Sequence, residues 1–181
     1  HNAGRAAREK LVEYRREIAA SIGAKEDEIL FVASGSEANN TCLKGYCRAH
    51  AGGGKKHIVT TAIEHPSVLR SFEQLRDEGF ETTFLPVDGE GFVRPEDLQK
   101  AVRPDTLLVS IGQANNEIGT IQDIRALRAL VPNAAFHTDA VQSFKKVPFD
   151  AQALGVDLEL AVADRDFVDE ALQLLPGQHV L

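Results

Sequence analysis

The sequence is poor in cysteine, has no excess of positive charge and contains no long apolar run. Each of these absences excludes a class of protein. No stretch of the 181 residues approaches the length of a membrane-spanning helix. The net charge of −7 argues against nucleic acid or an anionic membrane as a partner, because both would repel an acidic chain. An anionic small molecule remains compatible with this charge, since a helix N-terminus can supply a local positive field.

The two cysteines, Cys42 and Cys47, are five residues apart within one expected helix. This spacing suits two packed thiols better than a disulfide framework. The first residues also lack the pattern of a signal peptide. We therefore expect a reducing, cytoplasmic compartment. Because the sequence begins at His1 and not at a methionine, we expect it to be a piece of a longer or processed chain.

What the sequence does contain is a regular alternation of expected strands and helices. Hydrophobic residues make up 43% and charged residues 26%, as in an ordinary globular protein with a sizeable core. The pattern predicts strands at 28–32, 57–61, 82–87, 106–111 and 135–139, and helices at 3–22, 36–50, 65–77, 95–102, 121–131 and 164–175. This order predicts an α/β fold, a three-layer α/β/α arrangement around a mostly parallel sheet.

Residues 32–40 have the pattern of an anion site. They follow the expected first strand, turn through Ser34, Gly35 and Ser36, and enter a helix. Unpaired N–H groups and the dipole at a helix N-terminus favour a phosphate, Gly35 permits close backbone approach, and Ser36 adds a hydroxyl. A second interpretation stays open, because Ser34 and Glu37 also form a capping-box pattern that would only start the helix.

Polar residues gather in four clusters, each directly after an expected strand. Ligands of open parallel sheets bind outside the carboxyl ends of the strands, so the clusters are expected to meet in one crevice. Each cluster also has a purely structural interpretation: His65 or Asp139 could cap a helix, and Asn115 with Asn116 could form a turn. The clusters are Ser34, Gly35 and Ser36; Glu64 and His65; Asn115, Asn116 and Glu117; and Asp139 and Gln142.

In this order the clusters resemble the cysteine desulfurase and selenocysteine lyase family, class V aminotransferase-like enzymes that use pyridoxal 5′-phosphate. The resemblance covers about residues 1–158. The matching segments are His1–Glu9, Ser34–Asn40, Thr60–Leu69, Ala114–Gln122 and His137–Gln142. It implies part of the large domain of a fold type I pyridoxal phosphate enzyme over residues 1–160. Residues 161–181 resemble the helical tail of the small domain.

The resemblance further implies an activity and its partners. The substrate would be L-cysteine, which the family converts to alanine plus enzyme-bound sulfur; the alternative is a selenocysteine lyase acting on selenocysteine. A sulfur-acceptor protein would take the product, and the chain would form a homodimer. No metal is implied.

The resemblance also assigns roles at the phosphate and at one face of the cofactor ring. Gly35 and Ser36 would hold the phosphate through a backbone N–H and a hydroxyl, in agreement with the anion-site pattern. His65 would stack on the pyridine ring and shuttle protons, which makes it the candidate catalytic residue.

Three further residues would bind the polar atoms of the ring. Asp139 would pair with the pyridine nitrogen and keep it protonated, so that the cationic ring withdraws electrons from the substrate. Asn116 and Gln142 would bind the phenolic oxygen.

The sequence lacks the residues on which the covalent chemistry of the family depends. Gly155–Leu158 matches, but the Ser-x-x-His-Lys segment with the Schiff-base lysine does not follow. The late loop cysteine and the arginine for the substrate carboxylate are missing too, because Cys42 and Cys47 lie in an early helix. Lys145 and Lys146 occupy an ordinary connecting segment, which is unsuited to a Schiff-base lysine. We therefore expect an internally truncated, inactive chain; the alternative is a non-catalytic relative that binds the cofactor or a full-length partner.

Overall fold

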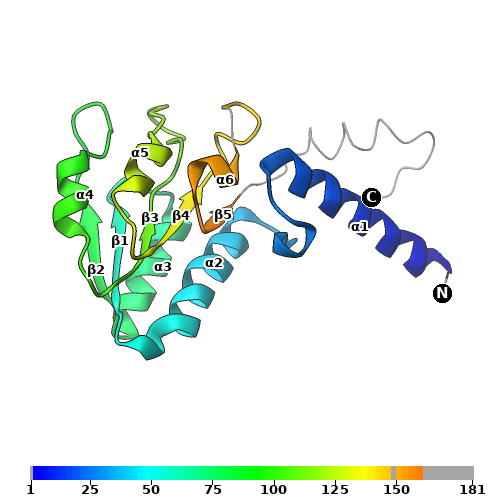
Figure 1. Cartoon of the computed structure of the whole chain (residues 1–181), viewed down its shortest axis with the longest axis horizontal. Coiled ribbons are helices and arrows are strands. Elements are labelled where there is room, and N and C mark those ends of the chain that lie inside the picture. The colour runs from blue at the N-terminus through cyan, green and yellow to red at the C-terminus, as the bar shows by residue number, and fades with distance from the viewer. Residues whose placement is uncertain (1, 148–149, 161–181) are drawn as a thin grey trace.

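The computed structural model describes residues 2–147 and 150–160, and a parallel five-stranded sheet forms its centre (Figure 1). The strands lie in the order β2-β1-β3-β4-β5, and each neighbouring pair is parallel. They are β1 (His57–Thr61), β2 (Glu81–Leu85), β3 (Thr106–Ser110), β4 (Ala135–Asp139) and β5 (Leu158–Leu160). The predicted α/β fold with a mainly parallel sheet is confirmed.

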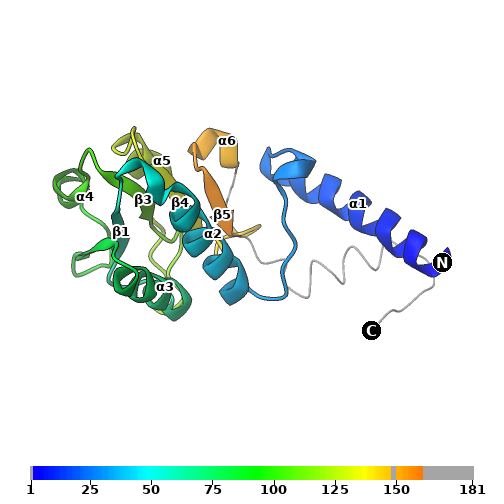
Figure 2. The ribbon, with the colours of Figure 1, turned by 90° about the horizontal axis from the view of Figure 1, so that it is seen from below.

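Helices cover both faces of the sheet (Figures 1 and 2). The α-helices are α1 (Asn2–Ile22), α2 (Gly35–His50), α3 (Pro66–Asp77), α4 (Pro95–Ala101), α5 (Ile124–Ala129) and α6 (Ala151–Leu154). Two single 3-10 turns, η1 (Glu26–Glu28) and η2 (Ala51–Gly53), follow α1 and α2. Two hydrophobic clusters on opposite faces of the sheet hold the three layers together.

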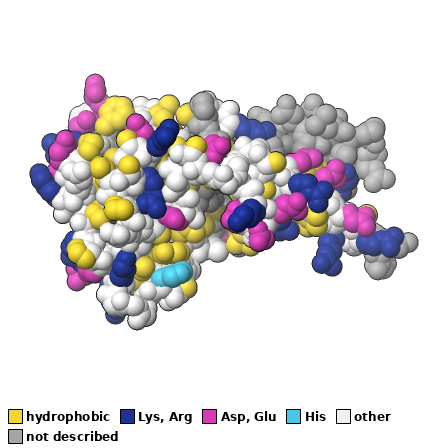
Figure 3. All heavy atoms as spheres, in the orientation of Figure 1, with side chains coloured by type: hydrophobic (Ala, Val, Ile, Leu, Met, Phe, Trp, Pro, Cys, Tyr) yellow, Lys and Arg dark blue, Asp and Glu magenta, His cyan; other side chains and the backbone are white. Residues whose placement is uncertain are grey.

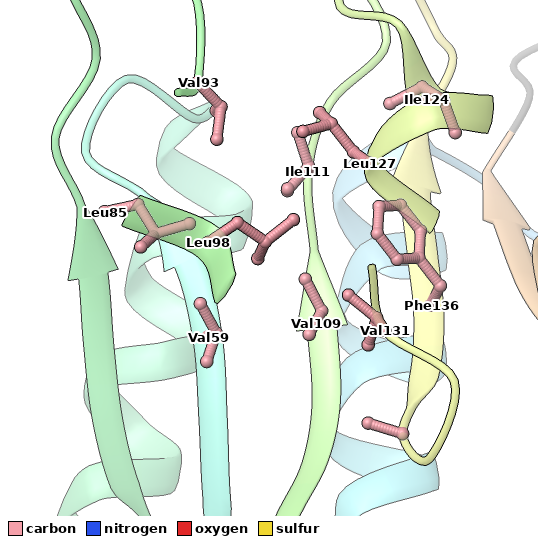
Figure 4. Packing of buried hydrophobic residues seen from close by; sticks show 11 residues of the cluster. Val59, Leu85, Val93, Leu98, Val109, Ile111, Ile124, Leu127, Val131 and Phe136 are labelled. Carbon is pink, nitrogen blue, oxygen red and sulfur yellow. The ribbon is translucent and has the colours of Figure 1, made fainter. Parts of the chain in front are cut away.

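The first cluster packs α4 and α5 against one face of the sheet, as Figure 4 shows. Leu98 of α4 and Leu127 of α5 meet alternate side chains of β1, β3 and β4, because successive residues of a strand point to opposite faces. Phe136 of β4 lies in this cluster and is fully buried.

The second cluster packs α2 and α3 against the other face. It joins Leu43 and Cys47 of α2 to Phe72 of α3 and to Ile58 of β1. The two helices contact one another along their length. Their first turns therefore lie together, close to the ends of β1 and β4.

Helix α1 extends away from the sheet, with its last turn nearest the other elements (Figures 1 and 2). Ala19 and Ile22, near that end, are buried. Most of the remaining surface of α1 carries charged side chains of both signs (Figure 3), with ion pairs such as Lys10–Glu13 at 2.7 Å. The predicted helix at 3–22 is thus confirmed.

Residues 28–32, which the sequence predicts as the first strand, do not form one. They leave η1 and join α1 to α2 without pairing to any described strand, and Leu30 is 67% exposed. Their contacts go to α1 instead. Arg15 Nε donates to the carbonyl of Ile29 at 3.2 Å, and the Arg15 guanidinium lies 5.0 Å from the centre of the Phe31 ring.

Two other elements differ from the prediction. Strand β5, which extends the sheet beside β4, was not predicted because three residues are too few to show a period of two. Helix α5 is shorter than the predicted 121–131. Asp123 caps it by accepting from the N–H of Ala126 at 3.0 Å, and Ile121 pairs in an isolated bridge with Ala114.

The predicted helix at 164–175 lies outside the described residues, as does the tail 161–181. The division of the chain at residue 160 therefore stays a prediction. Within 2–147 and 150–160, no helix combines the length and the apolar character needed to cross a membrane.

Candidate functional site

A cavity of about 380 Å³ opens at the carboxyl-terminal edge of the sheet. Its walls come from the first turns of α2 and α3 and from the segments that follow β1, β3 and β4. The volume lies within the range of small-molecule sites.

The cavity brings together all six residues that the sequence predicts at the site. They are Gly35, Ser36, His65, Asn116, Asp139 and Gln142. Three of the four polar clusters reach it from strand ends, as predicted. The first cluster reaches it from the connection after η1, since the strand expected before it is absent. The individual roles of these residues stay predictions.

At the start of α2 the structure shows the predicted helix cap, and the anion site stays a prediction. Ser34 is the N-cap, and its hydroxyl accepts from the N–H of Glu37 at 3.2 Å. The Glu37 carboxylate reaches back to the N–H of Ala33 at 2.7 Å, one residue before the usual capping-box position. No described residue accepts from the N–H groups of Gly35 and Ser36, which both line the cavity. The helix start thus offers free donors to an anion.

His65 combines a structural contact with a place in the cavity wall. It is the N-cap of α3, and its Nδ1 accepts from the N–H of Ser67 at 3.2 Å. The hydroxyl of Ser67 lies 2.7 Å from the same nitrogen. Because Nδ1 is the acceptor, the neutral ring carries its proton on Nε2.

Asp139 ends β4 and is held by two donors. Its Oδ1 accepts from the N–H of Val141 at 3.0 Å, and its Oδ2 accepts from Asn39 Nδ2 at 2.9 Å. The second nitrogen-bound hydrogen of Asn39 goes to Ser67 Oγ, also at 2.9 Å. Asn39 is 1% exposed, and its part in the site was not predicted. Its position in the first turns of α2, four residues after Gly35, was the one available signal.

Glu64 is a second residue of the wall that was named only as part of a cluster. Its carboxylate accepts from Thr61 Oγ1 at 2.7 Å and from the N–H of Gly112 at 3.0 and 3.2 Å. Burial raises the pKa of Glu64 to about 7 against the lowering effect of these hydrogen bonds, and the nearby Asp139 charge adds to the rise. This carboxyl therefore gives up its proton at a higher pH than an ordinary glutamate does.

The Asn115–Asn116 segment forms the turn that the sequence allowed. Asn115 Oδ1 accepts from the N–H groups of Glu117 and Ile118, at 2.9 and 3.1 Å, and Nδ2 donates to the carbonyl of Ile63 at 2.9 Å. This turn fixes the loop after β3 against the loop after β1. Asn116 lines the cavity as a result.

The groups needed for covalent chemistry are not in the described wall. Every lysine of the sequence lies within the described residues, and none lines the cavity. Lys145 and Lys146 are both exposed. Cys42 and Cys47 do not line it either, and burial raises the pKa of both thiols, that of Cys47 to about 12.

Comparison with known proteins gives matches that extend over nearly the whole of the described chain. The family model for class-V aminotransferases matches residues 1–163. The chain is 49% identical over 160 residues to the cysteine desulfurase IscS of Dictyoglomus turgidum, covering 87% of this chain and 40% of that protein. It is 47% identical over 147 residues to a mitochondrial cysteine desulfurase of Arthroderma benhamiae, covering 80% of this chain and 29% of that protein.

Solved structures agree with these matches. A NifS-like protein superposes with a TM-score of 0.86 at 36% identity, over 92% of this chain and 47% of that one. A structure described as SspA in complex with cysteine gives a TM-score of 0.86 at 32% identity, over 92% of this chain and 48% of that one. The chain thus spans less than half the length of these relatives.

Proposed function

Because this chain belongs to the class V aminotransferase family and is a homologue of the cysteine desulfurases, we propose that its cavity is a pyridoxal 5′-phosphate site of the desulfurase type. The family is dependent on pyridoxal phosphate. One observation carries the proposal: the six residues that the sequence resemblance assigned to the cofactor line a single cavity of suitable size. This chain covers only 40% of its relative from Dictyoglomus turgidum. The desulfurase activity of a complete protein is therefore also a proposal.

The donors and acceptors of the cavity fit this cofactor. The free N–H groups at the start of α2, with the Ser36 hydroxyl, suit a phosphate, and the Asp139 carboxylate suits a protonated pyridine nitrogen. No arginine or lysine of the described chain lines the cavity, so the field of the α2 N-terminus would replace a cationic side chain. When bound, the cofactor supplies an electron sink for the substrate.

The chain's own residues would bind and orient. Asp139 would hold a proton at the ring nitrogen, and Asn116 and Gln142 would bind the phenolic oxygen. His65, with its proton on Nε2 and its Nδ1 fixed to Ser67, would lie against the ring and move protons from Nε2.

This chain by itself would bind the cofactor without a covalent bond and would not release sulfur from cysteine. None of its lysines lines the cavity, and the thiols of Cys42 and Cys47 lie elsewhere. These observations fit a piece of a desulfurase and equally fit the second candidate function, a non-catalytic relative that binds the cofactor or a full-length partner.

The test is a titration of the pure chain with pyridoxal phosphate, followed by visible absorbance. Asp139→Ala should weaken binding about tenfold to a hundredfold, because a hydrogen bond to a charged group is lost. Asp77→Ala, the same change on the exposed end of α3, is the control. Equal affinity in all three proteins would refute a site at the cavity.

A second assay addresses catalysis. With cysteine added, we expect no sulfide above the background of the free cofactor. A version with a Ser-x-x-His-Lys segment after Leu158 and the late loop cysteine should release it. Sulfide release by the unmodified chain, abolished by Asp139→Ala, would show that the expected inactivity is wrong.

The proposal extends to assembly, partners and compartment. Exposed apolar residues on and after α1 support a homodimer: Leu11, Val12, Leu30, Phe31 and Val32. Light scattering should then give twice the 19.7 kDa of the chain. The substrate of the complete protein would be L-cysteine or selenocysteine, with a sulfur-acceptor protein as partner. The free thiols of Cys42 and Cys47 support a reducing, cytoplasmic location.

A further inference from the structure

The side chain of Asn39 joins two walls of the cavity. Its single NH2 group donates one hydrogen to Asp139 Oδ2 and the other to Ser67 Oγ, both at 2.9 Å. Ser67 Oγ lies in turn 2.7 Å from His65 Nδ1. One continuous chain of hydrogen bonds therefore runs from the end of β4 through α2 to the cap of α3.

The direction of this chain is fixed by charge. The carboxylate of Asp139 only accepts, so the amide of Asn39 must present its nitrogen, and a flipped amide would place two oxygens against each other. Ser67 Oγ accepts from Asn39, which leaves its own hydrogen for His65 Nδ1. The ring nitrogen Nδ1 thus accepts from this hydroxyl as well as from the N–H of Ser67, and the proton of the neutral ring stays on Nε2.

Asn39 also carries a cost. Its Oδ1 is buried and has no partner among the described residues. The unpaired oxygen offsets part of what the two donated hydrogen bonds contribute to stability. Such costs are typical of residues that a site retains for function.

We propose that Asn39 is a positioning residue that couples Asp139 to His65. It orients the carboxylate and, through the Ser67 hydroxyl, adds to the N–H of Ser67 in favouring the Nε2–H form of the imidazole. This inference deepens the proposed function, since Asp139 and His65 are the two residues assigned to the ring nitrogen and the ring face of pyridoxal phosphate.

The experiment uses the apo chain and two NMR signals. The 15N shifts of His65 report which ring nitrogen holds the proton, and the 13C shift of the Asp139 carboxyl reports its hydrogen bonds. We expect Asn39→Leu to move both signals and to raise the Nδ1–H population several-fold, with little change in thermal stability. Asn40→Leu is the matched control, because Asn40 is the next residue of α2, donates to the carbonyl of Ser36 and does not line the cavity.

Ser67→Ala removes only the hydrogen bonds that the Ser67 hydroxyl makes with Asn39 and His65. It should change the His65 signal and leave the Asp139 signal unchanged, and it provides the test if Asn39→Leu does not fold. The proposal is overturned if Asn39→Leu gives the same two signals as Asn40→Leu, or if Ser67→Ala leaves His65 unchanged.

A titration with pyridoxal phosphate separates this inference from the proposed function. If the unmodified chain binds the cofactor, Asn39→Leu should bind it several-fold more weakly than Asn40→Leu does, and equal affinities would count against the coupling. If the unmodified chain does not bind, the proposed function fails, whereas the two NMR signals still decide whether Asn39 couples Asp139 to His65.

Discussion

The carboxylate of Glu64 lies against the backbone of Gly112, with its two oxygens 3.0 and 3.2 Å from the Gly112 nitrogen. The contact ties the loop after β1 to the end of β3. A Cβ at Gly112 would lie 2.8 Å from Glu64 Oε2, so the carboxylate would have to shift away from its hydrogen bonds to admit a side chain. The two loops that carry His65 and Asn116 are thereby held at a fixed separation, and both members of the pair can be tested.

Glu64 should make stability depend on pH. Its pKa is raised from the ordinary 4.5 to about 7, so the native state binds the proton more tightly than the unfolded state does. The resulting stabilisation is complete below pH 4.5 and is lost as the pH rises through 7, by up to about 3 kcal/mol. Glu64→Gln should abolish this loss, as measured by urea unfolding at several pH values.

The comparison at each pH cancels other titrating groups. His137, whose pKa burial lowers to about 4, contributes equally to both proteins. Glu73→Gln on the exposed face of α3 is the control. If Glu64→Gln and the unmodified chain follow parallel curves from pH 4.5 to 7, Glu64 does not titrate there.

Gly112→Ala should destabilise the chain by about 1–3 kcal/mol, because the new methyl group overpacks the contact with Glu64. Gly45→Ala is the control: Gly45 lies inside α2 with nothing within 4 Å of a built Cβ, so alanine should stabilise by about 0.5–1 kcal/mol. Thermal unfolding of both variants measures the two effects. In a Glu64→Ala background the cost of Gly112→Ala should fall, and an unchanged cost would show that the strain lies elsewhere.

The sequence predicts β1, β3 and β4 well, because short, mainly apolar runs such as Thr106–Ser110 are buried on both faces. The prediction fails at 28–32, where an apolar run of similar composition stays largely exposed and contacts Arg15 of α1. Nothing in a short run tells a sheet from a helix as its neighbour. Local composition therefore identifies a strand only where the tertiary structure also places the apolar run in the sheet.

In the functional site, too, some residues could be predicted from the local sequence and others could not. Residues that follow a strand end, such as His65 and Asp139, were predictable because the edge of a parallel sheet gathers them. Asn39 was not, because its contact with Asp139 joins residues 100 positions apart and depends on how α2 lies beside α3. Tertiary packing creates that contact, and no local pattern encodes it.

Phe136→Ala should cost about 3–5 kcal/mol, because it opens a cavity in the cluster between β4 and α5. Phe136 is fully buried, whereas Phe92 is 40% exposed, so Phe92→Ala is the matched control and should cost much less. Unfolding by guanidinium with a single fluorescent or circular-dichroism probe measures both. Equal losses would mean that the cluster of Figure 4 does not dominate stability.

The two thiols should be slow to react in the native chain. Burial raises the pKa of Cys47 to about 12, with a contribution from the charge of Glu78, and burial also raises the pKa of Cys42. At pH 8 only about one Cys47 thiol in ten thousand is then a thiolate, and the thiolate is the nucleophile. A coloured disulfide reagent should label neither cysteine quickly in buffer, and it should label both in guanidinium.

The variants Cys42→Ser and Cys47→Ser assign any slow labelling to one of the two thiols. Cys42 is expected to react first because it is only half-buried. Rapid labelling of either thiol in buffer would show that it is exposed and activated, and it would then become a candidate acceptor for sulfur. Slow labelling of both would mean that neither thiol serves as a sulfur acceptor under the proposed function.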